Sequence, residues 1–194
     1  MVILGLDIST SNVGMVLLES GDSQRHKLIK ANGYPISGIR GLYDKACYIR
    51  EQLTKDCEGV KIDAIVVEES LMSFRRSMSS AGVIAILNRF NGILSFVVRD
   101  SFKVPIHFIS SISARKSVGI KLDKSLDTKM QIFDWVKSRS EMKEYSWPTK
   151  VMKAGSRKGE TVFEGHCFDI SDAFVVACWA CENLNTNQLD ETIC

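Results

Sequence analysis

The sequence predicts an α/β domain with a mixed β-sheet, in which three antiparallel strands are followed by parallel strands, flanked by helices. Three short apolar stretches open the chain, separated by polar or glycine-containing turns, which is typical of antiparallel strands. Helical and strand patterns then alternate, which favours parallel pairing in the same sheet. A strongly apolar helical pattern closes the regular part of the sequence.

The individual elements follow from periodicity and from turn residues. Residues 62–67 are the clearest strand, because a continuous apolar run of this length suits a central strand buried on both faces. Residues 38–57 place apolar side chains at helical spacing, and Gly59 ends the pattern. We further expect strands at 2–6, 14–18, 27–34 and 105–109, and helices at 79–98, 110–118, 128–137 and 168–183.

Composition and segment lengths narrow the classes of protein. The formal net charge is only +2, so a nucleic-acid partner would have to be bound by local basic patches. We see no apolar stretch that approaches the length needed to cross a bilayer. Six cysteines follow no framework pattern and no secretion signal is seen, so we expect a cytoplasmic protein with reduced thiols. We expect residues 1–194 to form a single domain with an inserted basic loop at about 138–165.

Four carboxylates from three distant stretches carry the functional prediction. Asp7 and Glu68 end two apolar strands, and strand ends of an open α/β sheet are where ligands gather. Asp169 and Asp172 lie three residues apart at the start of the last helix, and therefore on one face. Four carboxylates brought together need a cation between them, and oxygen ligands favour Mg²⁺ or Mn²⁺. A pair of such ions supports phosphodiester cleavage, which predicts a metal-dependent nuclease.

Each acid also has an ordinary explanation. Acids in the first helical turn are favoured by the helix dipole, and Asp7 could be a turn residue. Glu68 is harder to explain in this way, because a charge near the centre of a sheet is costly without a partner. In the last helix, the Asp pair lies outside the expected core stripe and shares a face with Val176 and Trp179. A solvated face would show the same pattern.

Several segments in the expected order resemble RuvC-type Holliday junction resolvases. The order and spacing hold across nearly the whole chain, which is more specific than any one motif. The departures from cellular members of the family would suit a viral or phage homologue. The similar segments are residues 3–7 with Gly14, 64–69, 88–94, 104–106, 113–119, 129–132 and the D-x-x-D-A motif at 169–174.

The resemblance implies a ribonuclease-H-like fold and a homodimer that makes paired nicks in four-way (Holliday) or related branched DNA. It also implies Mg²⁺ or Mn²⁺ as cofactor, with two ions per active site. Lys129 matches the lysine that opens the family's late helix near the scissile phosphate. We expect helix 79–98 to supply much of the dimer interface, because small and apolar residues run around several of its faces. The four metal-binding acids of the family match Asp7, Glu68, Asp169 and Asp172.

Basic residues outside the acids are candidates for DNA contacts. Arg115 and Lys116 stand near a basic position of the family that is offset in this sequence. Arg75 and Arg76 follow the second acid and could hold a phosphate, although a solvated turn explains them equally well. The 138–165 loop could grip phosphates and stack Trp147 on bases, with a solvated surface loop as the alternative. Its basic candidates are Lys150, Lys153, Arg157 and Lys158.

Two other functions stay open at this point. Residues 5–14 resemble the first phosphate loop of the actin and sugar-kinase superfamily, which would indicate an ATP-dependent phosphotransferase. Those enzymes need two such domains, and no second glycine-rich phosphate loop is seen in this sequence. The other alternative is a catalytically inert scaffold that binds junctions, against which the presence of all four acids argues. ATP binding tests the first alternative, and junction cleavage with Mg²⁺ tests the second.

Overall fold

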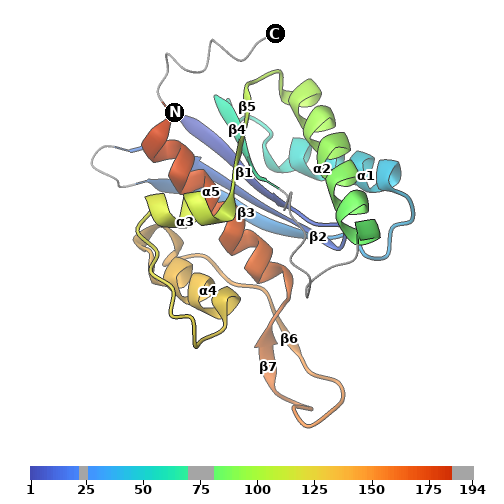
Figure 1. Ribbon diagram of the computed structural model, residues 1–194, viewed down its shortest axis with the longest axis vertical. Coiled ribbons are helices and arrows are strands. Elements are labelled where there is room, and N and C mark those ends of the chain that lie inside the picture. Colours follow the sequence, from blue (N-terminus) through green and yellow to red (C-terminus); the bar gives the residue numbers. More distant parts are fainter. Residues whose placement is uncertain (22–25, 70–80, 185–194) are drawn as a thin grey trace.

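A five-stranded mixed sheet forms the centre of the molecule (Figure 1). The computed structural model describes residues 1–21, 26–69 and 81–184. The strand order is β3-β2-β1-β4-β5, with the first three strands antiparallel and the last two parallel to β1. The mixed sheet predicted from the sequence is therefore confirmed. Its strands are β1 (Val2–Ile8), β2 (Asn12–Glu19), β3 (Lys27–Pro35), β4 (Ala64–Glu68) and β5 (Ile106–Ile109).

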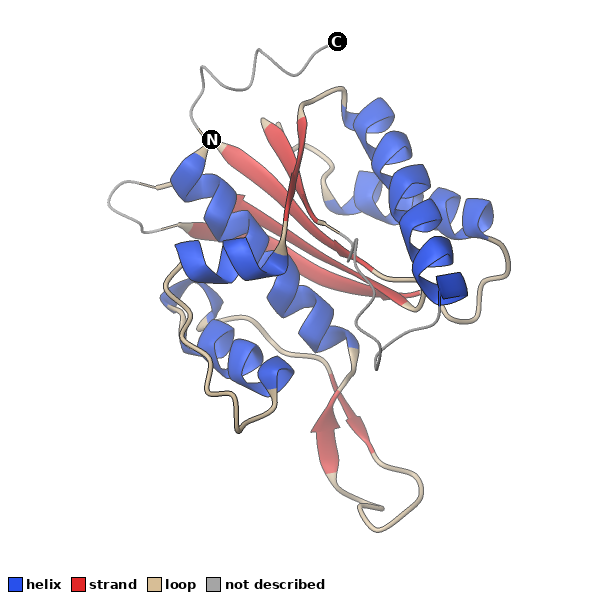
Figure 2. Ribbon diagram, viewed as in Figure 1, coloured by secondary structure: helices blue, strands red, loops and turns tan. Residues whose placement is uncertain are grey.

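Helices cover both faces of this sheet (Figure 2). Helices α1 (Leu42–Asp56) and α2 (Ala81–Phe102) pack on one face. The other face carries α3 (Ser111–Ser117), α4 (Thr128–Ser138) and α5 (His166–Asn183). Successive strand residues point to opposite faces, so Ile3 joins the core under α5 and Leu4 the core under α1 and α2. Two apolar cores thus hold the central strands, as their continuous apolar runs predict.

Helix α5 approaches the first two strands closely at two glycines. A Cβ atom built at Gly5 would lie 2.5 Å from the carbonyl oxygen of Ala173. A Cβ atom at Gly14 would overlap the backbone of Asp169. These glycines, which resemble a kinase phosphate loop in the sequence, therefore face the backbone of α5. Their lack of a side chain fixes where the first turns of α5 sit on the sheet.

Residues 138–165 are more ordered than the predicted loop. They contain a short 3₁₀ helix, η2 (Ser140–Met142), and two strands, β6 (Thr149–Val151) and β7 (Thr161–Phe163). The two strands form an antiparallel hairpin that projects away from the sheet beyond the start of α5 (Figure 1). Strands of three residues are too short to show an alternating pattern, which is why the sequence gives no sign of them.

Helix α2 is long and apolar enough to cross a membrane by length and composition. The expectation that no stretch approaches this length is therefore wrong. In the structure α2 packs against α1 and buries Phe90, Leu94 and Val98 in the core. A core helix of a folded domain passes the same length and composition test, so the test is weak support for a membrane span.

Candidate active site

Three of the four predicted acids converge beside the carboxyl ends of β1 and β4. These strands are parallel neighbours with Leu6 opposite Val67, which brings the next residues, Asp7 and Glu68, side by side. Helix α5 crosses the same place and adds Asp172. One carboxylate oxygen from each of these acids lies within 4.8 Å of the other two, and all three residues are partly buried. The sheet and the helix therefore build one acidic cluster.

Asp169 stands one helical turn before Asp172, in the first turn of α5. It is not part of the group of three whose oxygens lie within 4.8 Å, but its charge raises the pKa of Asp7 and Glu68. Its backbone lies against Gly14, the residue opposite Asp7 in the β1–β2 pair. The structure thus brings all four predicted acids into one neighbourhood, with Asp169 at its edge.

Asp7 is the most strongly perturbed of these acids. Burial raises its pKa well above the usual range, and the charges of Glu68, Asp172 and Asp169 raise it further. The charge of Lys129 opposes these effects. Burial likewise raises the pKa of Asp169 to about 6, and Lys129 again lowers it. Lys129, exposed in the first turn of α4, is therefore close enough to act on the cluster, although its catalytic role stays a prediction.

Arg115 on α3 reaches into the same cluster. Its terminal nitrogen donates to the Oδ1 atom of Asp172 at 2.9 Å, and both side chains are mostly buried. The pKa of Glu68 is raised to about 7 by burial and by the charge of Asp172, and the charge of Arg115 lowers it. Arg115 was predicted as a DNA contact, but here it pairs with an acid. Lys116 is exposed beside it and, with Arg115, lines a cavity of about 400 Å³.

Sequence reasoning missed the residues that support Glu68. The buried Asn91 side chain on α2 donates to the backbone carbonyl oxygen of Glu68 at 3.5 Å, and its own oxygen accepts from Ser95 at 3.2 Å. A hydrogen bond from Ser111 lowers the pKa of the Glu68 side chain. A signal for Asn91 was present, because it is a polar residue beside the apolar stripe of Phe90 and Leu94. Nothing in the sequence places Ser111 near Glu68.

Of the remaining predicted DNA contacts, the structure describes only those of the 138–165 segment. Arg75 and Arg76 fall outside the residues that the structure describes. The four basic residues of the predicted loop all belong to the β6–β7 hairpin and its tip, where each is exposed. They are Lys150, Lys153, Arg157 and Lys158.

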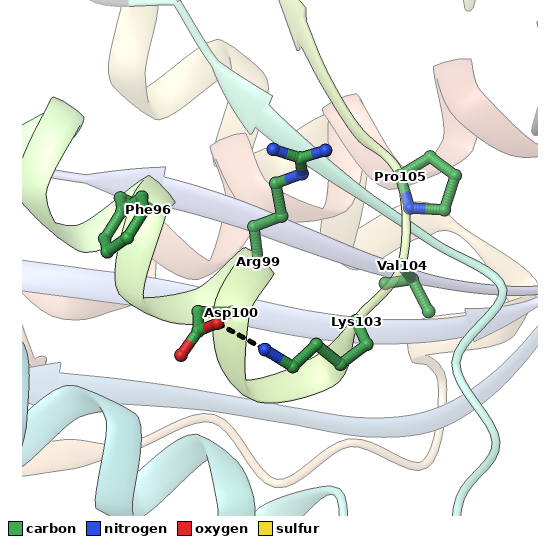
Figure 3. A pocket seen from close by; sticks show the side chains of 6 residues that line it. All are labelled: Phe96, Arg99, Asp100, Lys103, Val104 and Pro105. Carbon is green, nitrogen blue, oxygen red and sulfur yellow. Dashed lines mark hydrogen bonds and ion pairs between the residues drawn. The ribbon is translucent and has the colours of Figure 1, made fainter. Parts of the chain in front are cut away.

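A separate pocket of about 300 Å³ lies at the carboxyl end of α2 (Figure 3). It is located where the chain enters β5, whereas the acids gather where the parallel strands end. Phe96 stands on one side of it and Pro105 on the other, and Asp100 forms an ion pair with Lys103 at its rim. With a single acid among its lining residues, this pocket has no carboxylate cluster. It is therefore not a candidate metal site.

The raised pKa of Glu68 predicts a pH-dependent cost to the metal-free fold. A carboxyl group whose pKa is higher in the folded than in the unfolded chain favours folding while protonated. This contribution is lost as the pH rises from 4.5, the ordinary pKa of a glutamate side chain, through about 7, the pKa of Glu68 in the folded chain. We expect Glu68→Gln to raise the free energy of unfolding by about 1–2 kcal/mol more at about pH 8 than at about pH 4. Urea unfolding in a chelator measures this difference.

The neighbouring Glu69 provides a matched control for this measurement. The Glu69 side chain is exposed. Its backbone N–H donates to the carbonyl oxygen of Ile109, and neither substitution removes this hydrogen bond. Glu69→Gln should change the stability equally at the two pH values. An equal gain for Glu68→Gln at both pH values would contradict the buried, charge-repelled state of this carboxyl group.

The fold has clear counterparts among solved structures. No protein-family model and no curated protein matches the chain. Thermus thermophilus RuvC in complex with Holliday junction substrate superposes with a TM-score of 0.64 at 13% identity, covering 92% of each chain. The yeast mitochondrial Holliday junction resolvase Ydc2 gives 0.56 at 15% identity, over 97% of this chain and 80% of that one. Fowlpox virus resolvase with junction DNA gives 0.51 at 13%, over 94% and 97%. The chain therefore has the ribonuclease-H-like fold of the RuvC-type resolvases, as the sequence predicts.

Proposed function

We propose that this chain is a metal-dependent, structure-selective endodeoxyribonuclease that resolves four-way (Holliday) or related branched DNA junctions by paired nicks. The observation that carries the proposal is the convergence of Asp7, Glu68 and Asp172 within 4.8 Å, at the strand ends of this fold. The likeness to resolvases solved with junction DNA supports the same substrate.

The residues of the cluster fit a hard divalent cation. All donors are carboxylate oxygens, the set that Mg²⁺ and Mn²⁺ prefer. Burial and mutual repulsion raise the pKa of Asp7 and Glu68, and a cation removes both costs. We propose two ions per site, held by Asp7, Glu68 and Asp172 with Asp169 beside them. When bound, such ions activate water and stabilise the charge of the leaving oxygen.

Other side chains of the site position the acids and the substrate. Arg115 fixes the orientation of Asp172 through a charge-assisted hydrogen bond. Asn91 holds the end of β4, and with it the backbone of Glu68. Lys129 is exposed beside the cluster, where its positive charge can attract the scissile phosphate. The acids thus stand on rigid strands and helices, which keeps the spacing of the ligands fixed.

A cleavage assay on three labelled substrates tests this function. The purified chain is incubated with a synthetic four-way junction, a flap and a plain duplex, each with Mg²⁺, Mn²⁺ or a chelator. We expect paired nicks in branched DNA with either metal, no cutting in the chelator, and little cutting of the duplex. Binding of the junction without cutting under all metal conditions would instead indicate an inert scaffold.

The kinase alternative loses its main support in the structure. The resemblance depends on the glycines of residues 5–14, but Gly5 and Gly14 lie against the backbone of α5. A phosphate loop needs backbone N–H groups that are open to the ligand. Detectable binding of ATP by this chain would reopen that alternative.

We also propose a single-domain, cytoplasmic protein that acts as a homodimer through α2. Paired nicks need two active sites, and α2 exposes 49% of Ile86 and 70% of Phe96. Sedimentation should give a mass of twice 21.7 kDa for the natural chain. Phe96→Glu should shift the mass toward the monomer, because it places a charge in the interface. A natural chain that sediments as a monomer would contradict the proposed dimer.

A further inference from the structure

The β6–β7 hairpin begins at the edge of the acidic cluster. Only Glu164 and Gly165 separate the last residue of β7 from α5, whose first two turns carry Asp169 and Asp172. Figure 1 shows the hairpin extending away from the sheet at this point. The base of the hairpin therefore lies only a few residues from these acids along the chain.

Aromatic side chains fix the base of the hairpin to the body of the protein. The buried ring of Phe133 on α4 lies 4.8 Å from Trp147, 4.8 Å from Phe163 and 5.6 Å from Phe168, centroid to centroid. These partners come from the chain before β6, from β7 and from α5. Edge-to-face contacts between aromatic rings contribute more stability than burial of their surface area alone would give. The hairpin is therefore held in a defined direction from its base.

The charge of the hairpin is one-sided. Its acid Glu160 pairs with Arg157 at 2.7 Å, and Glu164 at its base lies 3.7 Å from His166. Lys150, Lys153 and Lys158 are exposed, and none of them has an ion pair within the described part of the chain. Burial lowers the pKa of His166, so Glu164 keeps its negative charge at neutral pH, whereas Glu160 is paired with Arg157. The three lysines remain available to an external anion and outnumber this one unpaired acid of the hairpin.

We propose that this hairpin is an arm that grips double-stranded DNA, in which Lys150, Lys153 and Lys158 contact the phosphate backbone of the duplex next to the active site. The inference rests on the proposed function, because it takes branched DNA as the substrate. In this proposal the arm increases the affinity for DNA and the salt dependence of that affinity, and it takes no part in the cutting step. Lysine contacts to phosphates add binding energy without reading the sequence.

The length of the arm matches this task. About five residues along each side separate the base of the hairpin from its tip. At about 3.3 Å per residue, they give a length of roughly 15–20 Å. This reach exceeds the ~12 Å width of the major groove of DNA, so base and tip can contact phosphates on both sides of a groove. The tip residues Gly155 and Gly159 both have positive φ angles, which allow the chain to turn tightly there.

Junction binding as a function of salt concentration tests the proposal. The natural chain is compared with Lys153→Ala/Lys158→Ala, using a fluorescent four-way junction in a chelator so that no cutting occurs. We expect the double variant to bind about tenfold more weakly at about 0.15 M salt, with a plot of log K against log salt about two units less steep. Lys153→Arg/Lys158→Arg should bind like the natural chain, because the positive charges remain.

Lys55→Ala/Lys61→Ala is the matched control, because both lysines are exposed and Lys61 lies three residues before β4, at the opposite end of that strand from Glu68. This pair should bind like the natural chain. The inference fails if the two alanine pairs bind alike, or if Lys153→Ala/Lys158→Ala slows cutting at saturating protein with Mg²⁺. Alike binding by the two alanine pairs would favour an arm for a protein partner, and slower cutting would place these lysines in the cutting step. Tight binding without cutting by the natural chain would contradict the proposed function alone.

Discussion

Replacing Asp7 by Asn should abolish junction cleavage and leave junction binding close to that of the natural chain. The change keeps the shape of the side chain and removes a carboxylate whose oxygen lies within 4.8 Å of those of Glu68 and Asp172. We expect a loss of more than about a hundredfold, because even the outer partners of metal ligands are worth 10–100-fold. Single-turnover cleavage with Mg²⁺ measures the loss, and binding in a chelator measures the affinity.

A second readout separates loss of the metal site from loss of the fold. Asp7→Asn removes one of the mutually repelling carboxylates that raise each other's pKa. The metal-free variant should therefore unfold at a temperature no lower than the natural chain, while Mg²⁺ should raise this temperature less. Asp134→Asn, an exposed acid on α4, should change neither quantity. Normal cutting by Asp7→Asn would refute the assignment of the site.

Replacing Gly14 by Ala should lower both stability and cleavage. The new methyl group would overlap the backbone of Asp169 and approach the backbone nitrogen of Ile170 within 2.7 Å. Gly14 also stands opposite Asp7, so the methyl group pushes the helix acids away from the strand acid. Overpacking of this kind costs about 1–3 kcal/mol, and we expect the upper part of that range because the obstacle is backbone. Urea unfolding and the junction cleavage assay measure the two effects.

Gly38→Ala is the control for this substitution, because a Cβ atom there meets nothing within 4 Å. It should leave stability within a few tenths of a kcal/mol and cleavage unchanged. If Gly14→Ala proved as stable and as active as Gly38→Ala, the close approach of α5 to the β1–β2 pair would not determine the geometry of the acids.

The sequence predicted the sheet well because its central strands are buried on both faces. A run such as residues 64–67 is apolar and buried at every position, which indicates a strand that is covered on both faces. The β6–β7 hairpin escaped because its strands are short and mostly exposed, so they carry no burial pattern. Local sequence patterns predict elements whose side chains are buried in the core. They do not predict an element such as this hairpin, which contacts the rest of the protein only at its base.

The same distinction applies to the site. Asp7 and Glu68 were predictable because each interrupts a run of apolar residues. The separate face expected for Asp169 and Asp172 is itself covered, since Val176 on that face is fully buried. Helix α5 packs against the sheet and also against α3 and α4, so several of its faces are covered by other parts of the protein. The pairing of Arg115 with Asp172 depends on this packing, which no local pattern contains.

The division of the acids between sheet and helix has a consequence for assembly of the protein. Asp7 comes from the first strand and Asp172 from the last helix, so bringing them together closes a loop of most of the chain, at a larger entropy cost than a local contact. A partly folded chain cannot present both groups to one ion. If the cluster binds a divalent cation as proposed, the cation would bind the folded chain in preference to partly folded forms, and adding it would shift the folding equilibrium toward the folded state.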